Sequence, residues 1–123
     1  MIIYISGKMT GLEDLGREDF DRAERALREQ GHIVLNPAAM PEGMPREAYI
    51  PIDLAMISAA DAVYMLRTWP TSRGACLEKA FAEYQGKRIL YEDPDEGARL
   101  TACQNMMGTL LARFGGGHEA GEL

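Results

Sequence analysis

The sequence has little cysteine and histidine. Its two cysteines, Cys76 and Cys103, and its two histidines are far apart in a chain of 123 residues. They form none of the close-spaced patterns that bind a structural metal or build a disulfide framework. We therefore expect no metal site and no other cofactor.

Long hydrophobic runs and an excess of positive charge are also missing. No stretch approaches the roughly 20 apolar residues of a membrane span, and the start, MIIYISGKMTG, lacks the features of a signal peptide. The net charge is -6, whereas proteins that bind nucleic acid usually present a basic patch to the phosphates. We expect a cytoplasmic protein whose partner is a small molecule, and neither a nucleic acid polymer nor a membrane.

What is present is the composition of one ordinary globular domain, with 46% hydrophobic and 26% charged residues. Short apolar runs alternate with segments of helical period. Strands are predicted at residues 2–6, 33–36, 62–66 and 88–91, and helices at 17–30, 46–60 and 73–85. Gly31 and Gly86 stand where helix C-caps belong. This alternation predicts a small doubly wound parallel α/β sheet of flavodoxin-like or Rossmann-like type, with four to five strands and helices on both faces.

The segment EGARLTACQNMMGTLLARF predicts one further helix after the fourth strand. Its apolar side consists of Met106, Met107, Leu110, Leu111 and Phe114. An exposed apolar patch of this size is unusual on a soluble monomer, so we expect a homodimer or larger homo-oligomer. The domain is predicted to span residues 1–114, and residues 115–123, GGGHEAGEL, to form a flexible tail.

Ligands of doubly wound sheets bind beyond the carboxyl ends of the strands, near the point where the strand order reverses. Three loops reach that edge, namely SGKMTG, NPAAMPEGMP and RTWPTSRG. The first holds Gly7 and Gly11 without the dinucleotide-binding spacing, so a phosphate role and a tight turn both remain open. The second suits a lid over an apolar ligand as well as a plain connection.

The third loop leads into TSRGACLE. Ser72 is a natural N-cap, and the exposed amides of a first helical turn bind anions. Gly74 costs a helix on the order of 1 kcal/mol relative to alanine, so close approach by a ligand is one reason for it. Glu78 lies one turn below Gly74, where the missing side chain leaves room above its carboxylate. A capped helix with a solvated glutamate is the simpler alternative. The stripe predicted to be buried consists of Leu77, Ala80, Phe81 and Tyr84, with Lys79 and Glu83 directed to solvent.

A second acid, Asp53, falls in the middle of an apolar helix face in YIPIDLAMISAAD. Its neighbours on that face are Tyr49, Ile50, Met56, Ile57 and Ala60. Burying a carboxylate unpaired is costly, so Asp53 needs partners, a raised pKa or a cavity. If the helix instead begins or kinks at Pro51, backbone amides and the helix dipole account for part of the charge.

These residues together resemble the nucleoside 2-deoxyribosyltransferase superfamily, which includes deoxynucleoside 5'-monophosphate N-glycosidases. The resemblance covers residues 2–91. It rests on Tyr4, Gly7 and Gly11 in YISGKMTG, on Asp53 and Asp61 in DLAMISAAD, and on Ser72, Gly74 and Glu78 in SRGACLE. It implies that Glu78 is the nucleophile that attacks C1' of the sugar and that Tyr4 orients it. It further implies that Asp53 assists proton transfer and sugar positioning, and that Ser72 belongs to the helix end that receives a 5'-phosphate.

The resemblance implies cleavage or transfer at the N-glycosidic bond of a nucleoside or nucleoside 5'-monophosphate, through a covalent glycosyl-glutamate intermediate. One carboxylate that traps the sugar carbon and one acid that helps the base to leave form a workable pair. Trp69 and Tyr49 are candidates for stacking on the base, and Lys8 and Arg73 for neutralising phosphate, although loop packing and plain exposure also explain them. The alternative is a non-catalytic nucleotide-binding regulatory module, which needs neither acid. A flavodoxin-like electron carrier has no evident flavin signature here.

Overall fold

The computed structural model describes residues 1–93, in which strands and helices alternate. The strands are β1 (Ile2–Ser6), β2 (Ile33–Leu35), β3 (Ala62–Met65) and β4 (Arg88–Tyr91). The helices are α1 (Arg17–Glu29), α2 (Arg46–Ala59) and α3 (Arg73–Tyr84), with short 3₁₀ helices η1 (Pro37–Ala39) and η2 (Trp69–Thr71). Each predicted strand and helix within this part of the chain is confirmed to within one residue at either end.

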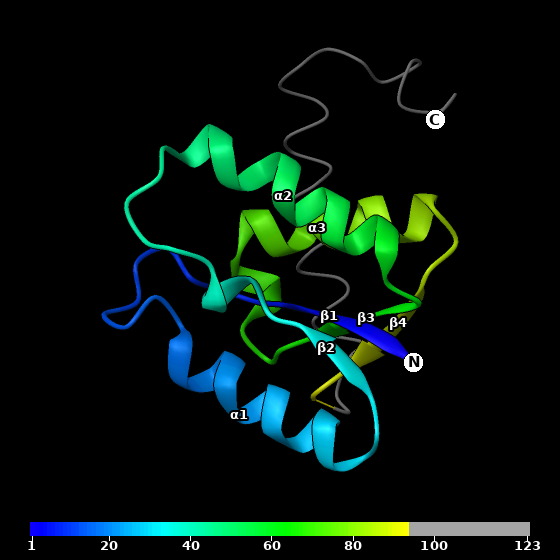
Figure 1. Cartoon of the computed structure of the whole chain (residues 1–123). Coiled ribbons are helices and arrows are strands. Elements are labelled where there is room, and N and C mark those ends of the chain that lie inside the picture. Colours follow the sequence, from blue (N-terminus) through cyan, green and yellow to red (C-terminus); the bar gives the residue numbers. More distant parts are fainter. Residues whose placement is uncertain (94–123) are drawn as a thin grey trace.

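The strands form one parallel sheet in the order β2-β1-β3-β4. Helix α1 covers one face, and α2 and α3 lie together on the other (Figure 1). The predicted α/β class, with helices on both faces of a parallel sheet, is confirmed. The chain crosses from one side of β1 to the other between β2 and β3, so the strand order reverses at the carboxyl ends of β1 and β3.

The central strand β1 is buried on both of its faces. Ile3 and Ile5 pack with Phe20 and other residues of the α1 side, while Tyr4 packs with Ile57 of α2 and other residues of the opposite side. Successive side chains of a strand point to opposite faces, and both faces of this strand are covered by helices. This explains why the segment IIYIS is apolar almost throughout.

Two helices end at the glycines expected there. Gly31 and Gly86 follow α1 and α3 with φ of 91° and 76°, a left-handed conformation that glycine adopts without strain. The amides of His32 and Lys87, one residue further on, donate to carbonyls of the preceding helix at 3.2 and 2.9 Å. This closes each helix and turns the chain toward β2 or β4.

Helix α3 buries a different face from the predicted one. Leu77 and Tyr84 are 52% and 74% exposed, and Ala80 is exposed as well. Of the predicted stripe only Phe81 packs against the core, where it is partly buried, and Glu83 is exposed as predicted. The face turned to the protein consists of Ala75, Cys76, Lys79 and Ala82. The small alanine and cysteine side chains let the helix approach the sheet closely, and the Lys79 ammonium group reaches Glu83 at 3.1 Å. The predicted solvent orientation of Lys79 was therefore wrong, because its side chain is buried and its ammonium group lies over the Trp69 ring while its charge stays paired with Glu83.

Helix α2 runs through Pro51 without ending. Because it begins at Arg46, Asp53 lies well inside the helix, and the alternative of a first-turn aspartate is wrong. Ile50, which was expected on the buried face, is 51% exposed.

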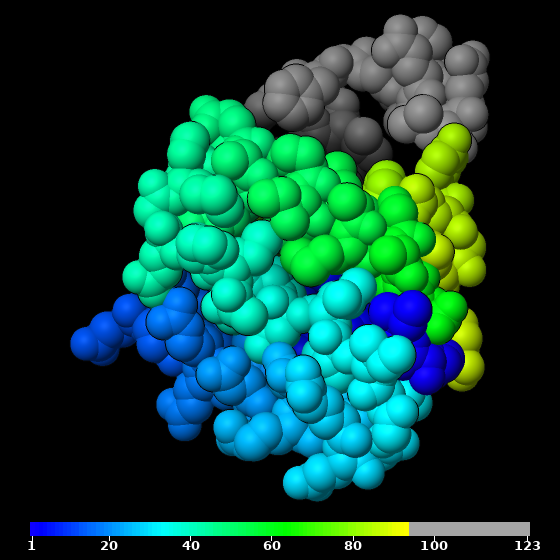
Figure 2. Space-filling model, viewed as in Figure 1, coloured from blue at the N-terminus to red at the C-terminus, as the bar shows by residue number. Residues whose placement is uncertain are grey.

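The surface seen in Figure 2 includes α2 and the edge strand β2, whose start lies beside the N-terminus. None of the helices within residues 1–93 is long and apolar enough to cross a bilayer. The helix predicted from EGARLTACQNMMGTLLARF and the tail 115–123 fall outside the described residues. The assembly predicted from that helix stays a prediction.

Candidate active site

Two acids and two hydroxyl groups from three elements converge near the carboxyl end of β1. Tyr4 and Ser6 are alternate residues of β1, so both side chains point to the face covered by α2 and α3. Helix α3 supplies Glu78 and α2 supplies Asp53. The site therefore lies where the strand order reverses, as expected for ligand sites of this architecture.

Both oxygens of the Glu78 carboxyl group receive a hydrogen bond from β1. The Tyr4 hydroxyl donates to Oε2 at 2.9 Å, and the Ser6 hydroxyl donates to Oε1 at 2.7 Å. Tyr4 and Ser6 are fully buried. Glu78 is therefore no solvated surface acid, because its carboxyl group is held against the centre of the sheet.

Asp53 has fewer partners than Glu78. Its Oδ1 is buried and has no hydrogen-bond partner among the described residues. The carboxyl groups of Asp53 and Glu78 lie close enough for a hydrogen bond when one of them carries a proton. Two ionised carboxylates cannot make that bond, because neither has a donor.

The environment makes this pair hold protons unusually tightly. Burial raises the pKa of Glu78 to about 7, the hydrogen bonds from Ser6 and Tyr4 oppose the rise, and the neighbouring Asp53 charge adds to it. Burial likewise raises the pKa of Asp53 to about 6, against an opposing hydrogen bond with Glu78. The pKa of Tyr4 is also raised, first by burial and then by the two acids, so Tyr4 remains a donor. Carboxyl groups that titrate near neutrality can act as acid or base at physiological pH.

The turn before Glu78 has the predicted cap. The Ser72 hydroxyl accepts a hydrogen bond from the Ala75 amide at 3.1 Å, so Ser72 is the N-cap of α3. Gly74 is exposed, and a Cβ atom added to it would meet only the Ser72 Oγ at 3.9 Å. Internal packing therefore does not explain the glycine. Arg73, beside it, is exposed.

The first loop uses its glycines structurally. A Cβ atom on Gly7 would lie 2.7 Å from the Leu66 side chain, and Gly11 has a φ of 86°. Close packing explains Gly7 and a turn explains Gly11. The Lys8 amide donates to the Thr68 hydroxyl at 3.0 Å and so ties this loop to the one after β3.

The two aromatic candidates for base stacking are engaged elsewhere. Trp69 is 1% exposed, with its ring 5.9 Å from that of Tyr91 and the Lys79 ammonium group 5.7 Å from its centre. The Tyr49 hydroxyl donates to the Pro41 carbonyl and accepts from the Met44 amide. Trp69 thus presents no free face to a ligand, and Tyr49 anchors the loop before α2. The burial of Trp69 argues against stacking on a base, whereas the hydrogen bonds of the Tyr49 hydroxyl do not involve the faces of its ring, so stacking by Tyr49 stays a prediction.

Two further residues differ from the sequence interpretation. Asp61 lies at the opposite, amino end of the sheet, where its carboxylate accepts from the Ile2 amide at 2.8 Å. Ser6 contacts Glu78 but was not among the predicted site residues. The available signal was its position two residues after Tyr4, on the same face of the strand.

Solved structures with this fold include two deoxyribosyltransferases. The 2-deoxyribosyltransferase of Leishmania mexicana superposes with a TM-score of 0.61 at 21% identity over 73% of this chain, and the chain spans 62% of that enzyme. The 2-deoxyribosyltransferase of the psychrotolerant bacterium Bacillus psychrosaccharolyticus gives 0.59 at 23% identity, over 74% of this chain and 71% of that one. The fold is thus of the deoxyribosyltransferase-like α/β class. The model of the family described as Domain of unknown function (DUF4406) matches residues 1–91, and the chain belongs to that family. No curated protein matches it.

Proposed function

We propose that this protein is an enzyme that cleaves, or transfers at, the N-glycosidic bond of a nucleoside or nucleoside 5'-monophosphate. Glu78 is the nucleophile and Asp53 the acid and base, while Tyr4 orients Glu78. The loop after β3, with Ser72, Arg73 and Gly74, contributes to substrate binding, and Lys8 completes the phosphate site.

The observation that carries the proposal is the asymmetric pair of carboxyl groups. Glu78 receives two hydrogen bonds, from Tyr4 and Ser6, whereas Asp53 Oδ1 receives none from the described residues. Hydrogen bonds to a carboxylate favour its ionised form, and a carboxyl group without donors favours its protonated form. This division suits a nucleophile next to an acid. The pKa values, about 7 for Glu78 and about 6 for Asp53, rank the two groups the other way, because Glu78 is the more deeply buried. Since the coupled pair shares one proton, we take the two donors to Glu78 to decide which group is ionised. The fold shared with two deoxyribosyltransferases adds support from a different direction.

The proposed reaction has two balanced steps. In the first, the Glu78 carboxylate forms a bond to C1' of the sugar as the N-glycosidic bond breaks. The bonding electron pair leaves with the base, which takes a proton from Asp53. In the second step, water or an acceptor base attacks C1' and releases Glu78, and the proton of the attacking group returns to Asp53.

The test is chromatographic detection of free base after incubation with a panel of nucleosides and their 5'-monophosphates, with and without a second base as acceptor. We expect free base from at least one substrate, and a new nucleoside if the enzyme is a transferase. Calorimetric binding of a nucleotide without release of base from any substrate would contradict the proposal and indicate the nucleotide-binding module instead.

A further inference from the structure

Strand β1 presents hydroxyl groups to both oxygens of Glu78. Tyr4 reaches Oε2 with a long side chain from the middle of the strand, and Ser6 reaches Oε1 with a short one from its end. Two bonds to different oxygens define the plane of a carboxyl group, whereas a single bond leaves it free to rotate. The orientation of Glu78 is therefore fixed by the strand and does not depend on α3 alone.

The Ser6 side chain is shielded from solvent, and the hydrogen bond that its hydroxyl donates goes to Glu78. The residue is fully buried, and its backbone carbonyl already accepts from the Leu66 amide at 2.8 Å. Its hydroxyl donates to Glu78 at 2.7 Å, the shorter of the two bonds to that group. A short hydrogen bond to an ionised oxygen is among the stronger kinds in proteins.

We propose that Ser6 is a positioning residue that, together with Tyr4, holds the Glu78 carboxylate in its reactive plane and keeps it ionised beside Asp53. This inference rests on the proposed function in so far as Glu78 is the nucleophile. Tyr4 alone leaves Oε1 without a donor from β1 in a site where burial and the nearby Asp53 both disfavour the charge.

The first test needs no substrate. Carbon-13 NMR of protein labelled at the glutamate carboxyl groups follows the titration of Glu78, whose signal is assigned by its loss in Glu78→Gln. The titratable groups that face Glu78 within residues 1–93 are Tyr4 from β1 and Asp53 from α2. In Ser6→Ala, the midpoint of Glu78 should rise by about one pH unit or more, because one charge-assisted hydrogen bond is lost.

Two matched variants separate this role from a general effect on structure. Ser58 is an exposed serine of α2 that contacts Gln85, and Ser58→Ala should leave the midpoint of Glu78 in place. Ser6→Thr keeps the hydroxyl, so the midpoint of Glu78 should lie close to its wild-type value. If Ser6→Thr proves too bulky for the buried site, Ser6→Cys, with its weaker donor, should give a midpoint between those of serine and alanine. An unchanged midpoint in Ser6→Ala would overturn the proposal.

The kinetic test uses a substrate found with the nucleoside panel. Ser6→Ala should lower kcat by roughly ten- to a hundredfold with little change in KM, and the acid limb of its kcat/KM profile should move to higher pH by the shift seen in NMR. A fall in kcat without any movement of that limb would indicate a structural role only. The two proposals fail separately, because an inactive wild-type protein with a shifted NMR midpoint contradicts the proposed function but not the role of Ser6.

Discussion

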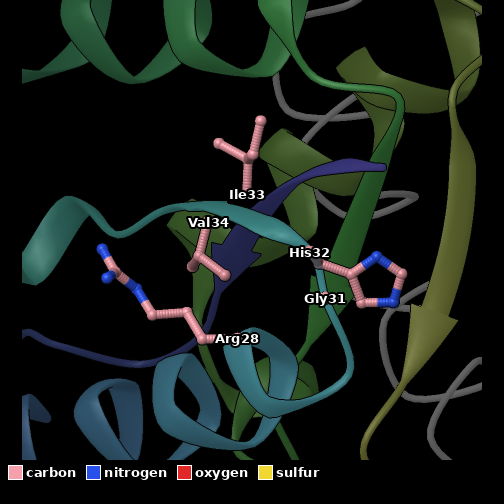
Figure 3. A pocket seen from close by; sticks show the side chains of 5 residues that line it. All are labelled: Arg28, Gly31, His32, Ile33 and Val34. Carbon is pink, nitrogen blue, oxygen red and sulfur yellow. The ribbon is translucent and has the colours of Figure 1, made fainter.

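The two ends of the sheet use polar side chains in opposite ways. At the amino end, Asp61 accepts from the Ile2 amide and His32 Nδ1 lies 3.1 Å from the amino group of Met1. The open depression beside them is lined by Arg28, Gly31, His32, Ile33 and Val34 (Figure 3). At the carboxyl end, Asp53 and Glu78 are pressed together with raised pKa values. Side chains at the amino end satisfy backbone groups and lie near water. At the carboxyl end, two buried carboxyl groups lie next to each other, which is unfavourable when both are charged and is typical of a functional site.

Removing the charge of Glu78 should have the largest effect on turnover of any change at the carboxyl end of the sheet. Glu78→Gln keeps the size of the side chain but cannot form the glycosyl bond, so turnover should fall about 10⁴-fold or more. The melting temperature should not decrease. The matched control is Glu83→Gln on the same helix, an exposed acid paired with Lys79, which should stay within about threefold of wild-type turnover by the free-base assay. Normal turnover in Glu78→Gln would show that this carboxyl group is only structural.

Exchanging the aspartates compares the two ends directly. Asp53→Asn should lower turnover by about 10² to 10³-fold, since general acid catalysis contributes factors of that size. Asp61→Asn should instead leave turnover nearly unchanged and lower the melting temperature, because the Ile2 amide loses a charged acceptor. Equal losses of turnover in both variants would contradict the division between the two ends.

The sequence was sufficient for the elements and for the residues of the acid pair. Strands with continuous apolar runs and helices closed by Gly31 and Gly86 are local signals, and they place the carboxyl ends of the strands together. Helix periodicity could not tell which face of α3 is buried, because that depends on how closely Ala75 and Ala82 let the helix approach the sheet. The burial of Trp69 and the bond between Ser6 and Glu78 join segments far apart in the chain, so no local pattern reveals them.

The cap of α3 gives a test of the proposed phosphate site. Ser72→Asp retains an N-cap acceptor for the Ala75 amide, so the stability of the helix should persist. Its negative charge repels a 5'-phosphate, and the preference for a monophosphate over its nucleoside should fall about tenfold or more in calorimetric Kd values. In Ser72→Ala, the preference for the monophosphate over the nucleoside should decrease, and the free energy of unfolding should also fall by about 1 kcal/mol. Equal affinities for monophosphate and nucleoside in the wild-type protein would remove the phosphate site from the proposal.

The acid pair should also shape the stability of the protein. Both groups hold protons more tightly in the folded than in the unfolded protein, since the pKa of Glu78 is about 7 and that of Asp53 about 6, against ordinary values of 4.5 and 3.8. Their contribution is therefore complete below about pH 4 and lost as the pH rises through 6 and 7. The free energy of unfolding due to the pair should fall by on the order of 3 kcal/mol between pH 4 and 8, after allowance for the partial exposure of Asp53. Denaturant titrations of wild type and of the Glu78→Gln, Asp53→Asn double variant test this, and parallel curves against pH would refute it.

The smallest expected effect separates the two glycines at the edges of the site. A Cβ atom on Gly74 meets only the Ser72 Oγ at 3.9 Å, whereas one on Gly7 lies 2.7 and 2.9 Å from atoms of Leu66. Gly74→Ala should therefore stabilise the free protein by up to about 1 kcal/mol through helix propensity, while Gly7→Ala should destabilise it by about 1 to 3 kcal/mol through overpacking. If a ligand approaches α3 over Gly74, the added methyl group should also weaken nucleotide binding several-fold while the melting temperature rises. Such an opposed pair of changes cannot come from a loss of structure. Unchanged affinity in a stabilised Gly74→Ala protein would mean that the space above this glycine is not part of the site.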